Sequence, residues 1–249
     1  MTPRVSVIMP AYRCEKTVEE SVRSALSQTL HEIEVIVADD GSDDGTPAIL
    51  SRLSEEDTRV RVVTLPENGG VANARNVAAR AARADRIAFL DSDDVWEADK
   101  LLRQLNVMDR TGAALVYTAA VCIDETGKET GKVFRVPETV TAERLLRGND
   151  VVTSTVLVRR DVYERHPMER SDLHEDLICW YRILSDGAKA VGINEPLLRY
   201  RVTTGSKSGN KWKSAVTAWR SYGYLKLGFF KRCRSFLGYC LHGVRRYWL

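Results

Sequence analysis

Acidic residues are missing from the end of this sequence. No Asp or Glu follows Glu195, although that segment contains twelve of the 37 Lys and Arg residues. The residues up to Glu195 hold the other 25 basic side chains and all 34 acidic ones, so they carry a net charge of −9 and the final segment carries +12. This asymmetry predicts two regions that face different partners.

Long apolar runs and paired cysteines are also missing. No stretch of about 18 apolar residues occurs, so no transmembrane helix is expected. The first residues show no secretion-signal pattern, and the five cysteines form no Cys-x-x-Cys pair, which favours reduced thiols and a cytoplasmic location. With 44% hydrophobic and 29% charged residues, wholesale disorder is excluded. A chain of 249 residues suffices for one α/β domain with an appendage.

The segment after the first apolar run lacks two well-known nucleotide-binding motifs. Residues 4–9 read as a buried strand, and Pro10-Ala11-Tyr12 follows directly. A dinucleotide oxidoreductase would need Gly-x-Gly-x-x-Gly there. A nucleotidyltransferase would need a Gly-rich loop containing Arg. Both classes are therefore disfavoured.

Strand-like and helix-like segments alternate through the first 112 residues. The apolar patterns predict strands at residues 4–9, 33–38, 60–65 and 86–90, and helices that include residues 15–28, 71–84 and 97–110. This order favours a parallel sheet with helices on both faces, in which ligands bind at the carboxyl ends of the strands. Polar clusters follow the strands, at Tyr12, Asp39-Asp40, Asn68–Gly70 and Asp91–Asp94.

The pattern changes after residue 112. Residues 114–123 and 132–136 flank a turn and predict a hairpin, residues 153–158 predict a further strand, and residues 173–185 a helix. We expect this half, residues 113–205, to complete a mixed sheet and to shape an acceptor site.

A cluster of carboxylates, Asp91-Ser92-Asp93-Asp94, stands directly after a predicted buried strand. Hard oxygen ligands of this kind hold the divalent cations that neutralise diphosphates. Taken alone, the cluster could equally be an acidic turn before the next helix.

Several motifs in order decide between these readings. The opening strand with Pro10-Ala11-Tyr12 resembles that of family-2 glycosyltransferases of the GT-A fold. So do Gln28-Thr29, residues 34–46 with their Asp-Asp-Gly-Ser turn, Asn68-Gly69-Gly70 with Ala74-Arg75-Asn76, and Asp91–Asp94. Later, His174-Glu175-Asp176 and Trp180 resemble the Glu-Asp motif of the family. The resemblance implies a Rossmann-like three-layer α/β/α sandwich over residues 1–205, with residues 1–112 as its nucleotide-binding half.

The resemblance also implies roles for individual residues. Tyr12 and Asp40 would contact the base of the nucleotide-sugar, expected to be a UDP-sugar, over a floor made by Pro10 and Ala11. Asn68 would lie in the same site or be a plain turn residue. Arg75 would approach the diphosphate, Asp91 would contact the ribose or share the metal, and Asp93 would bind Mn²⁺ or Mg²⁺ directly.

Asp176 is the predicted general base. A carboxylate beside an acceptor hydroxyl can take its proton as the glycosidic bond forms. The alternative is an acidic first turn that only favours the helix dipole. Inversion of the anomeric centre is implied by the resemblance alone. A non-catalytic module that binds a sugar nucleotide or scaffolds an assembly complex is the competing function, and it would need no base.

One departure from the family concerns metal binding. Relatives often carry a His after the Tyr-Arg pair, whereas here Tyr200-Arg201 is followed by residues 202–208 without one. Arg201 and Lys207 could supply part of the missing charge neutralisation, or residues 202–208 could form a mobile loop over the donor.

The segment 206–249 mixes aromatic residues with Lys and Arg. This composition predicts an amphipathic helical tail on an anionic membrane surface. Packing on the domain or on a second subunit, as in a homodimer, is the alternative, and nucleic-acid binding is disfavoured because no matching fold pattern accompanies it. The whole chain resembles bacterial transferases of teichuronic acid, capsule and exopolysaccharide synthesis. A peripheral enzyme on the inner face of the cell membrane, with a lipid-linked glycan acceptor, is therefore expected.

Overall fold

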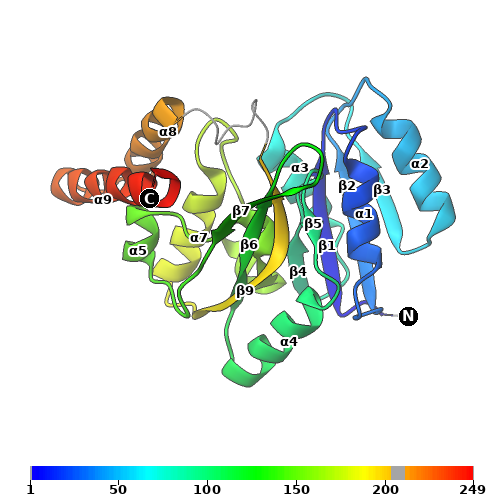
Figure 1. Cartoon of the computed structure of the whole chain (residues 1–249), viewed down its shortest axis with the longest axis horizontal. Coiled ribbons are helices and arrows are strands. Elements are labelled where there is room, and N and C mark those ends of the chain that lie inside the picture. The colour runs from blue at the N-terminus through cyan, green and yellow to red at the C-terminus, as the bar shows by residue number, and fades with distance from the viewer. Residues whose placement is uncertain (1, 203–210, 249) are drawn as a thin grey trace.

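A single mixed sheet forms the centre of the computed structural model, which describes residues 2–202 and 211–248 (Figure 1). Within these residues its strands are Val5–Ala11 (β1), Ile33–Asp39 (β2), Val60–Thr64 (β3), Arg86–Phe89 (β4), Val95–Trp96 (β5), Leu115–Ile123 (β6), Glu129–Phe134 (β7), Leu157–Arg159 (β8) and Ala190–Arg201 (β9). Their order is β3-β2-β1-β4-β8-β6-β9-β5, and β7 pairs with β6.

The first half of the chain supplies one parallel part of the sheet, and β6 and β9 of the second half form another parallel pair. β1 pairs with β2 and β4, and β2 pairs with β3, all in parallel. Every residue of β1 and β2 is buried, as expected where helices cover both faces of a parallel sheet. The carboxyl ends of these strands therefore meet at one edge, and the predicted polar clusters follow them.

Helices cover both faces of the sheet. Their bounds are Val18–Leu26 (α1), Thr46–Glu56 (α2), Val71–Arg80 (α3), Lys100–Thr111 (α4), Ala142–Arg147 (α5), Arg160–Arg165 (α6), Glu175–Ser185 (α7), Lys211–Tyr224 (α8) and Phe229–Trp248 (α9). Side chains of α3, α5 and α7 belong to one apolar cluster, and those of α1, α2 and α4 belong to another. The predicted three-layer α/β/α sandwich is confirmed.

The predicted helices at residues 71–84 and 97–110 are shortened for different reasons. The helix expected at residues 71–84 ends at Arg80, because the backbone N–H groups of Arg83 and Ala84 donate to Glu34 and Ser6 instead. The helix expected from residue 97 begins at Lys100, because β5 takes Val95–Trp96 into an antiparallel pair with β9.

The second half joins the same sheet. The predicted hairpin is present as β6 and β7. The strand expected at residues 153–158 was only partly right, because Thr153–Thr155 forms a 3₁₀ turn before β8. β8 pairs with both β4 and β6, so it joins the two predicted halves, 1–112 and 113–205, in one sheet.

The tail is helical and packs on the domain beside α5 and α7 (Figure 1). Tyr222 is fully buried, and its hydroxyl donates to the carbonyl of Leu146 at 2.5 Å. The predicted boundary at 205/206, Lys207 and most of the predicted loop at residues 202–208 lie outside the described residues. In the part of the chain that the structure describes, no helix is both long and apolar enough to cross a membrane.

Candidate active site

The predicted base-binding residues gather where β1 and β2 end. The backbone N–H of Asp40 donates to the carbonyl of Ala11 at 2.8 Å, so Pro10, Ala11 and Tyr12 lie beside the turn that follows β2. Pro10 and Ala11 are buried, whereas Tyr12 is 41% exposed. The structure thus brings these four residues together, with the Tyr12 ring accessible to a ligand.

Asp40 connects the predicted base-binding residues to the loop that contains Asn68 through hydrogen bonds. Its two carboxylate oxygens accept the backbone N–H groups of Gly69 at 2.9 Å and Gly70 at 2.8 Å. Gly41 has a φ of 74°, and a Cβ there would lie 2.9 Å from the carbonyl carbon of Glu67. Only glycine permits that approach without a backbone shift. Asp40 therefore fixes the loop, and any contact with a base N–H would use its remaining lone pairs.

Arg75 joins the predicted donor site to the predicted base. Its guanidinium is buried and donates to Asp91 Oδ1 at 2.6 Å and to Glu175 Oε1 at 3.0 Å. Burial opposes the charge, but Asp91 and Glu175 outweigh it and raise the pKa of Arg75 above its usual value. Both carboxylates thus hold Arg75 away from open solvent, and its expected contact with a diphosphate stays a prediction.

The carboxylate of Asp176 is oriented by a side chain from outside α7. Asn149 Nδ2 donates to Asp176 Oδ2 at 2.8 Å, and Asn149 itself precedes Asp150, which contacts His242 of α9 at 2.8 Å. Asp176 also contributes to the raised pKa of Arg75, so it lies within electrostatic reach of the Arg75–Asp91 pair. The end of β4 and the start of α7, which are far apart in sequence, therefore lie close together in the fold.

The negative charge of the acidic cluster Asp91–Asp94 is not fully neutralised by nearby basic side chains. Burial and then the charge of Asp91 raise the pKa of Asp93 to about 6. Burial and the charges of Asp93 and Asp91 raise the pKa of Asp94 well above its usual value. Asp94 accepts the backbone N–H of Arg201 at 2.9 Å, and its Oδ2 has no hydrogen-bond partner among the described residues. Crowded carboxylates of this kind are what a bound cation neutralises.

The Arg201 side chain is not exposed in the predicted site. It is buried, and its guanidinium donates to the carbonyl of Asp93 at 2.8 Å and to Glu20 Oε2 at 2.6 Å. Its charge lowers the pKa of Asp93 in part, and its expected share in neutralising the donor stays a prediction. Its main contacts nevertheless hold the backbone of the acidic turn to β9.

The donor set fits a divalent cation only if the substrate completes it. Within residues 2–202 and 211–248 there is no cluster of three or more His, Cys, Asp or Glu side chains suited to a metal. Asp91 and Asp93 would therefore supply two carboxylates, and phosphate oxygens and water would fill the other positions. Cation binding is then expected to depend on the donor nucleotide.

Sequence reasoning missed Asn149 and the role of Glu175 as a partner of Arg75. Asn149 is 27 positions from Asp176, and Arg75 is 100 positions from Glu175. No local pattern marks such pairs. The only sequence signal was the polar Asn149-Asp150 pair between Arg147-Gly148 and the apolar Val151-Val152.

Asn149→Ala is expected to lower kcat about tenfold and to leave the donor KM unchanged, because Asp176 would lose the hydrogen bond that orients it while the donor site stays intact. Steady-state kinetics test this. Asn149→Asp, which would place a second carboxylate beside Asp176, should shift the acidic limb of the kcat–pH profile upward. Unchanged kcat in Asn149→Ala would remove Asn149 from this positioning role.

The fold and this arrangement define an enzyme of the GT-A glycosyltransferase class. Residues 6–166 match the family described as Glycosyl transferase family 2, and the chain belongs to that family. It is 36% identical to the putative teichuronic acid biosynthesis glycosyltransferase TuaG of Bacillus subtilis, over 98% of this chain and 97% of that protein. It is 36% identical to an Escherichia coli protein, UDP-Glc:alpha-D-GlcNAc-diphosphoundecaprenol beta-1,3-glucosyltransferase WfaP, over 85% and 82% of the two chains.

Two solved structures share the fold. S. aureus TarS 1-349 in complex with UDP-GlcNAc superposes with a TM-score of 0.72 at 20% identity, over 98% of this chain and 73% of that one. The mannosyltransferase PcManGT from Pyrobaculum calidifontis, in complex with GDP-Man and Mn²⁺, gives 0.68 at 20% identity, over 96% and 69%.

Proposed function

We propose that this glycosyltransferase moves a sugar from a UDP-sugar to a hydroxyl of a lipid-linked glycan, in the synthesis of a cell-surface polysaccharide, with inversion. The observation that carries the proposal is the Arg75 bridge. It joins Asp91, at the predicted diphosphate end of the site, to Glu175, the neighbour of Asp176. A donor-binding carboxylate and a candidate base thus share one buried cation.

The choice of donor and acceptor rests on relatives. WfaP is named for a UDP-glucose donor and a diphosphoundecaprenol-linked acceptor, and TarS was solved with UDP-GlcNAc. In this chain the exposed Tyr12 ring offers a stacking face, and the remaining lone pairs of the Asp40 carboxylate would accept a base N–H. A lipid-linked acceptor places the enzyme at the cytoplasmic face of the membrane that carries it.

Asp176 performs the proton transfer in this proposal. The acceptor hydroxyl oxygen attacks the anomeric carbon, the bond from that carbon to the diphosphate breaks, and the bonding electrons leave with the diphosphate. The hydroxyl proton passes to Asp176, whose orientation the Asn149 contact fixes. A single displacement of this kind inverts the anomeric centre.

Asp91 and Asp93 would hold a divalent cation together with the donor. Such an ion, Mn²⁺ or Mg²⁺, stabilises the charge that develops on the leaving diphosphate. The raised pKa of Asp93 and the unpartnered oxygen of Asp94 support the fit, because both reflect uncompensated negative charge. Metal dependence is part of the proposal.

The competing function is a module that binds a sugar nucleotide without catalysis. It would need the Tyr12 and Asp40 region but no oriented carboxylate opposite the donor. The Asn149–Asp176 contact favours the enzyme, and transfer assays on the Asp176 variant separate the two.

A thermal-shift experiment tests the donor site. UDP with Mn²⁺, at about 100 times its dissociation constant, is expected to add about 2.7 kcal/mol of stability. For a chain of this size that raises the midpoint by about 5–10 °C. GDP, TDP and CMP are the matched comparisons, and Asp93→Asn should remove the metal-dependent part. Absence of a shift with every nucleotide would contradict the proposed donor site.

A further inference from the structure

The outer face of α9 is apolar, although it does not face the domain. Phe230, Leu237, Leu241 and Val244 are 87%, 62%, 58% and 52% exposed. At about 100° per residue they fall within about 60° of arc on one side of the helix. We call these four residues the α9 stripe. A helix that packs on a domain normally shows polar residues there, so this stripe indicates a binding surface.

The opposite face of α9 is already used for packing on the domain. Phe236 packs edge-on against Trp219, with ring centroids 5.3 Å apart, and His242 contacts Asp150 at 2.8 Å. The Tyr239 hydroxyl lies 2.7 Å from that of Ser214 in α8. These inward side chains therefore pack on the domain, which was the alternative to membrane contact that the sequence left open. Four other residues make the outward surface.

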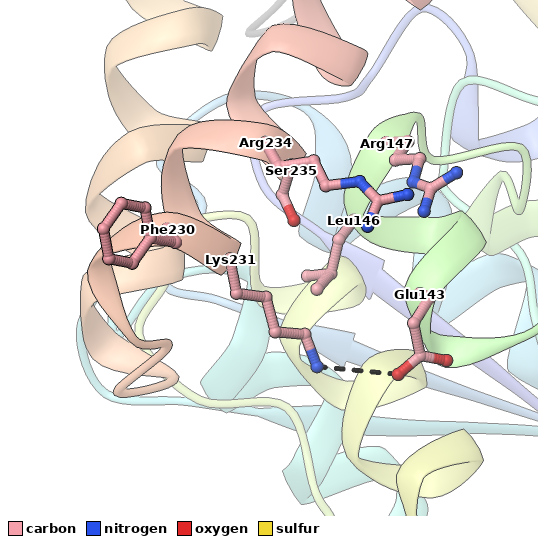
Figure 2. Close-up of a pocket in the computed structure, with 7 residues that line it drawn as sticks. All are labelled: Glu143, Leu146, Arg147, Phe230, Lys231, Arg234 and Ser235. Atoms are coloured by element: carbon pink, nitrogen blue, oxygen red, sulfur yellow. Dashed lines mark ion pairs between the residues drawn. The ribbon is translucent and has the colours of Figure 1, made fainter.

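A basic groove borders the α9 stripe. Figure 2 shows it between α5 and α9, lined by Glu143, Leu146, Arg147, Phe230, Lys231, Arg234 and Ser235, with a volume of ≈ 330 Å³. Lys231 pairs with Glu143 at 3.5 Å. Arg147 and Arg234 both line this groove (Figure 2) and have no carboxylate partner among residues 2–202 and 211–248. Two guanidinium groups in one groove favour a phosphate.

We propose that the α9 stripe and its basic groove dock this enzyme on an anionic phospholipid surface, with the stripe in the acyl boundary and a headgroup phosphate at Arg147 and Arg234. Apolar residues beside cations are the composition of interfacial helices. No acidic residue follows Glu195, so a second copy placed on the stripe would bring like charges together without carboxylates from the tail. Charge complementarity therefore favours lipid.

This inference deepens the proposed function, which supplies the reason for a membrane location. The inward face of the tail also contacts the start of α7: the backbone N–H of His174 donates to Ser221 of α8 at 3.1 Å, directly before Glu175 and Asp176. Docking through α9 would thus place the predicted base close to a membrane-borne acceptor. Vesicle binding is nevertheless measurable without any transfer reaction.

Cosedimentation of the full chain with vesicles tests the docking. Vesicles of phosphatidylcholine with and without phosphatidylglycerol, free of polyprenyl lipid, are compared at low salt and at about 0.5 M NaCl, where charge is strongly screened. Wild type is expected to bind only the anionic vesicles and to lose about tenfold in affinity at high salt. Leu237→Ser/Leu241→Ser should weaken binding about tenfold or more, and Arg147→Ala/Arg234→Ala should weaken it similarly.

The matched control is Leu102→Ser/Val133→Ser, which removes two apolar side chains that are 37% and 39% exposed elsewhere on the domain. It should bind like wild type.

The proposal is overturned if the Leu237→Ser/Leu241→Ser variant binds anionic vesicles as tightly as wild type does. A lower mass of that variant than of wild type in sedimentation also overturns the proposal, because it would make the stripe a subunit contact. Displacement of wild type from the vesicles by inorganic diphosphate at matched ionic strength overturns it as well, because that result would assign the groove to a soluble anion. Unchanged transfer to a water-soluble acceptor shows that the stripe variant is folded, whereas failure of that transfer in wild type would count against the proposed function alone.

Discussion

Asp176→Asn is expected to lower kcat by about 10²–10⁴-fold, the usual contribution of a general base. The amide keeps the shape of the side chain and its contact with Asn149 but cannot accept a proton from an attacking hydroxyl. Donor binding should be retained, because Asp176 is not among the residues placed around the nucleotide. Steady-state transfer kinetics and the UDP–Mn²⁺ thermal shift measure the two effects separately.

Asp186→Asn is the matched control. Asp186 follows the opposite end of α7 and pairs with His166 at 2.6 Å on the surface. Its replacement should leave kcat near the wild-type value. A wild-type kcat in Asp176→Asn would remove the proposed base, and a lost thermal shift in that variant would show that Asp176 serves donor binding instead.

Arg75→Met is expected to destabilise the fold by about 3 kcal/mol, because Asp91 and Glu175 would lose the buried cation between them. For a chain of this length the thermal midpoint should fall by about 6–12 °C. Transfer should fall as well, since Asp91 and the start of α7 would no longer be fixed relative to each other. Calorimetry and kinetics on the same preparation measure both.

The exposed Arg159–Asp161 pair provides the comparison. Its side chains are about half exposed, so Arg159→Met should change the midpoint little. An Arg75→Met protein as stable as wild type would show that the bridge does not hold the two parts of the site together. Full stability with lost transfer would point to a direct contact between Arg75 and the diphosphate.

The parallel half of the fold was predictable from local pattern. β1 and β2 are mostly apolar and rich in β-branched residues, a pattern that predicts strands buried on both faces. The acidic turn at Asp91 and the turn at Asp40 could be placed because each follows such a run directly. β5 was not predicted, since two residues carry no periodicity and their pairing with β9 depends on distant contacts.

The contacts that organise the site could not be read from the sequence. The contacts of Arg75 with Asp91 and Glu175 were not expected, because they depend on the packing of α7 over the end of β4 in the folded chain. The outward face of α9 was also beyond prediction. Composition shows that the tail is basic and aromatic, but only packing on α5 decides which of its side chains remain exposed.

The anomeric configuration of the transferred sugar tests the central claim most directly. Nuclear magnetic resonance of the product formed from an α-linked UDP-sugar reports that configuration from its coupling constant. A single displacement assisted by Asp176 predicts a β-linked product. An α-linked product would contradict the mechanism, because retention requires a different path from one in which a base activates the acceptor for direct attack.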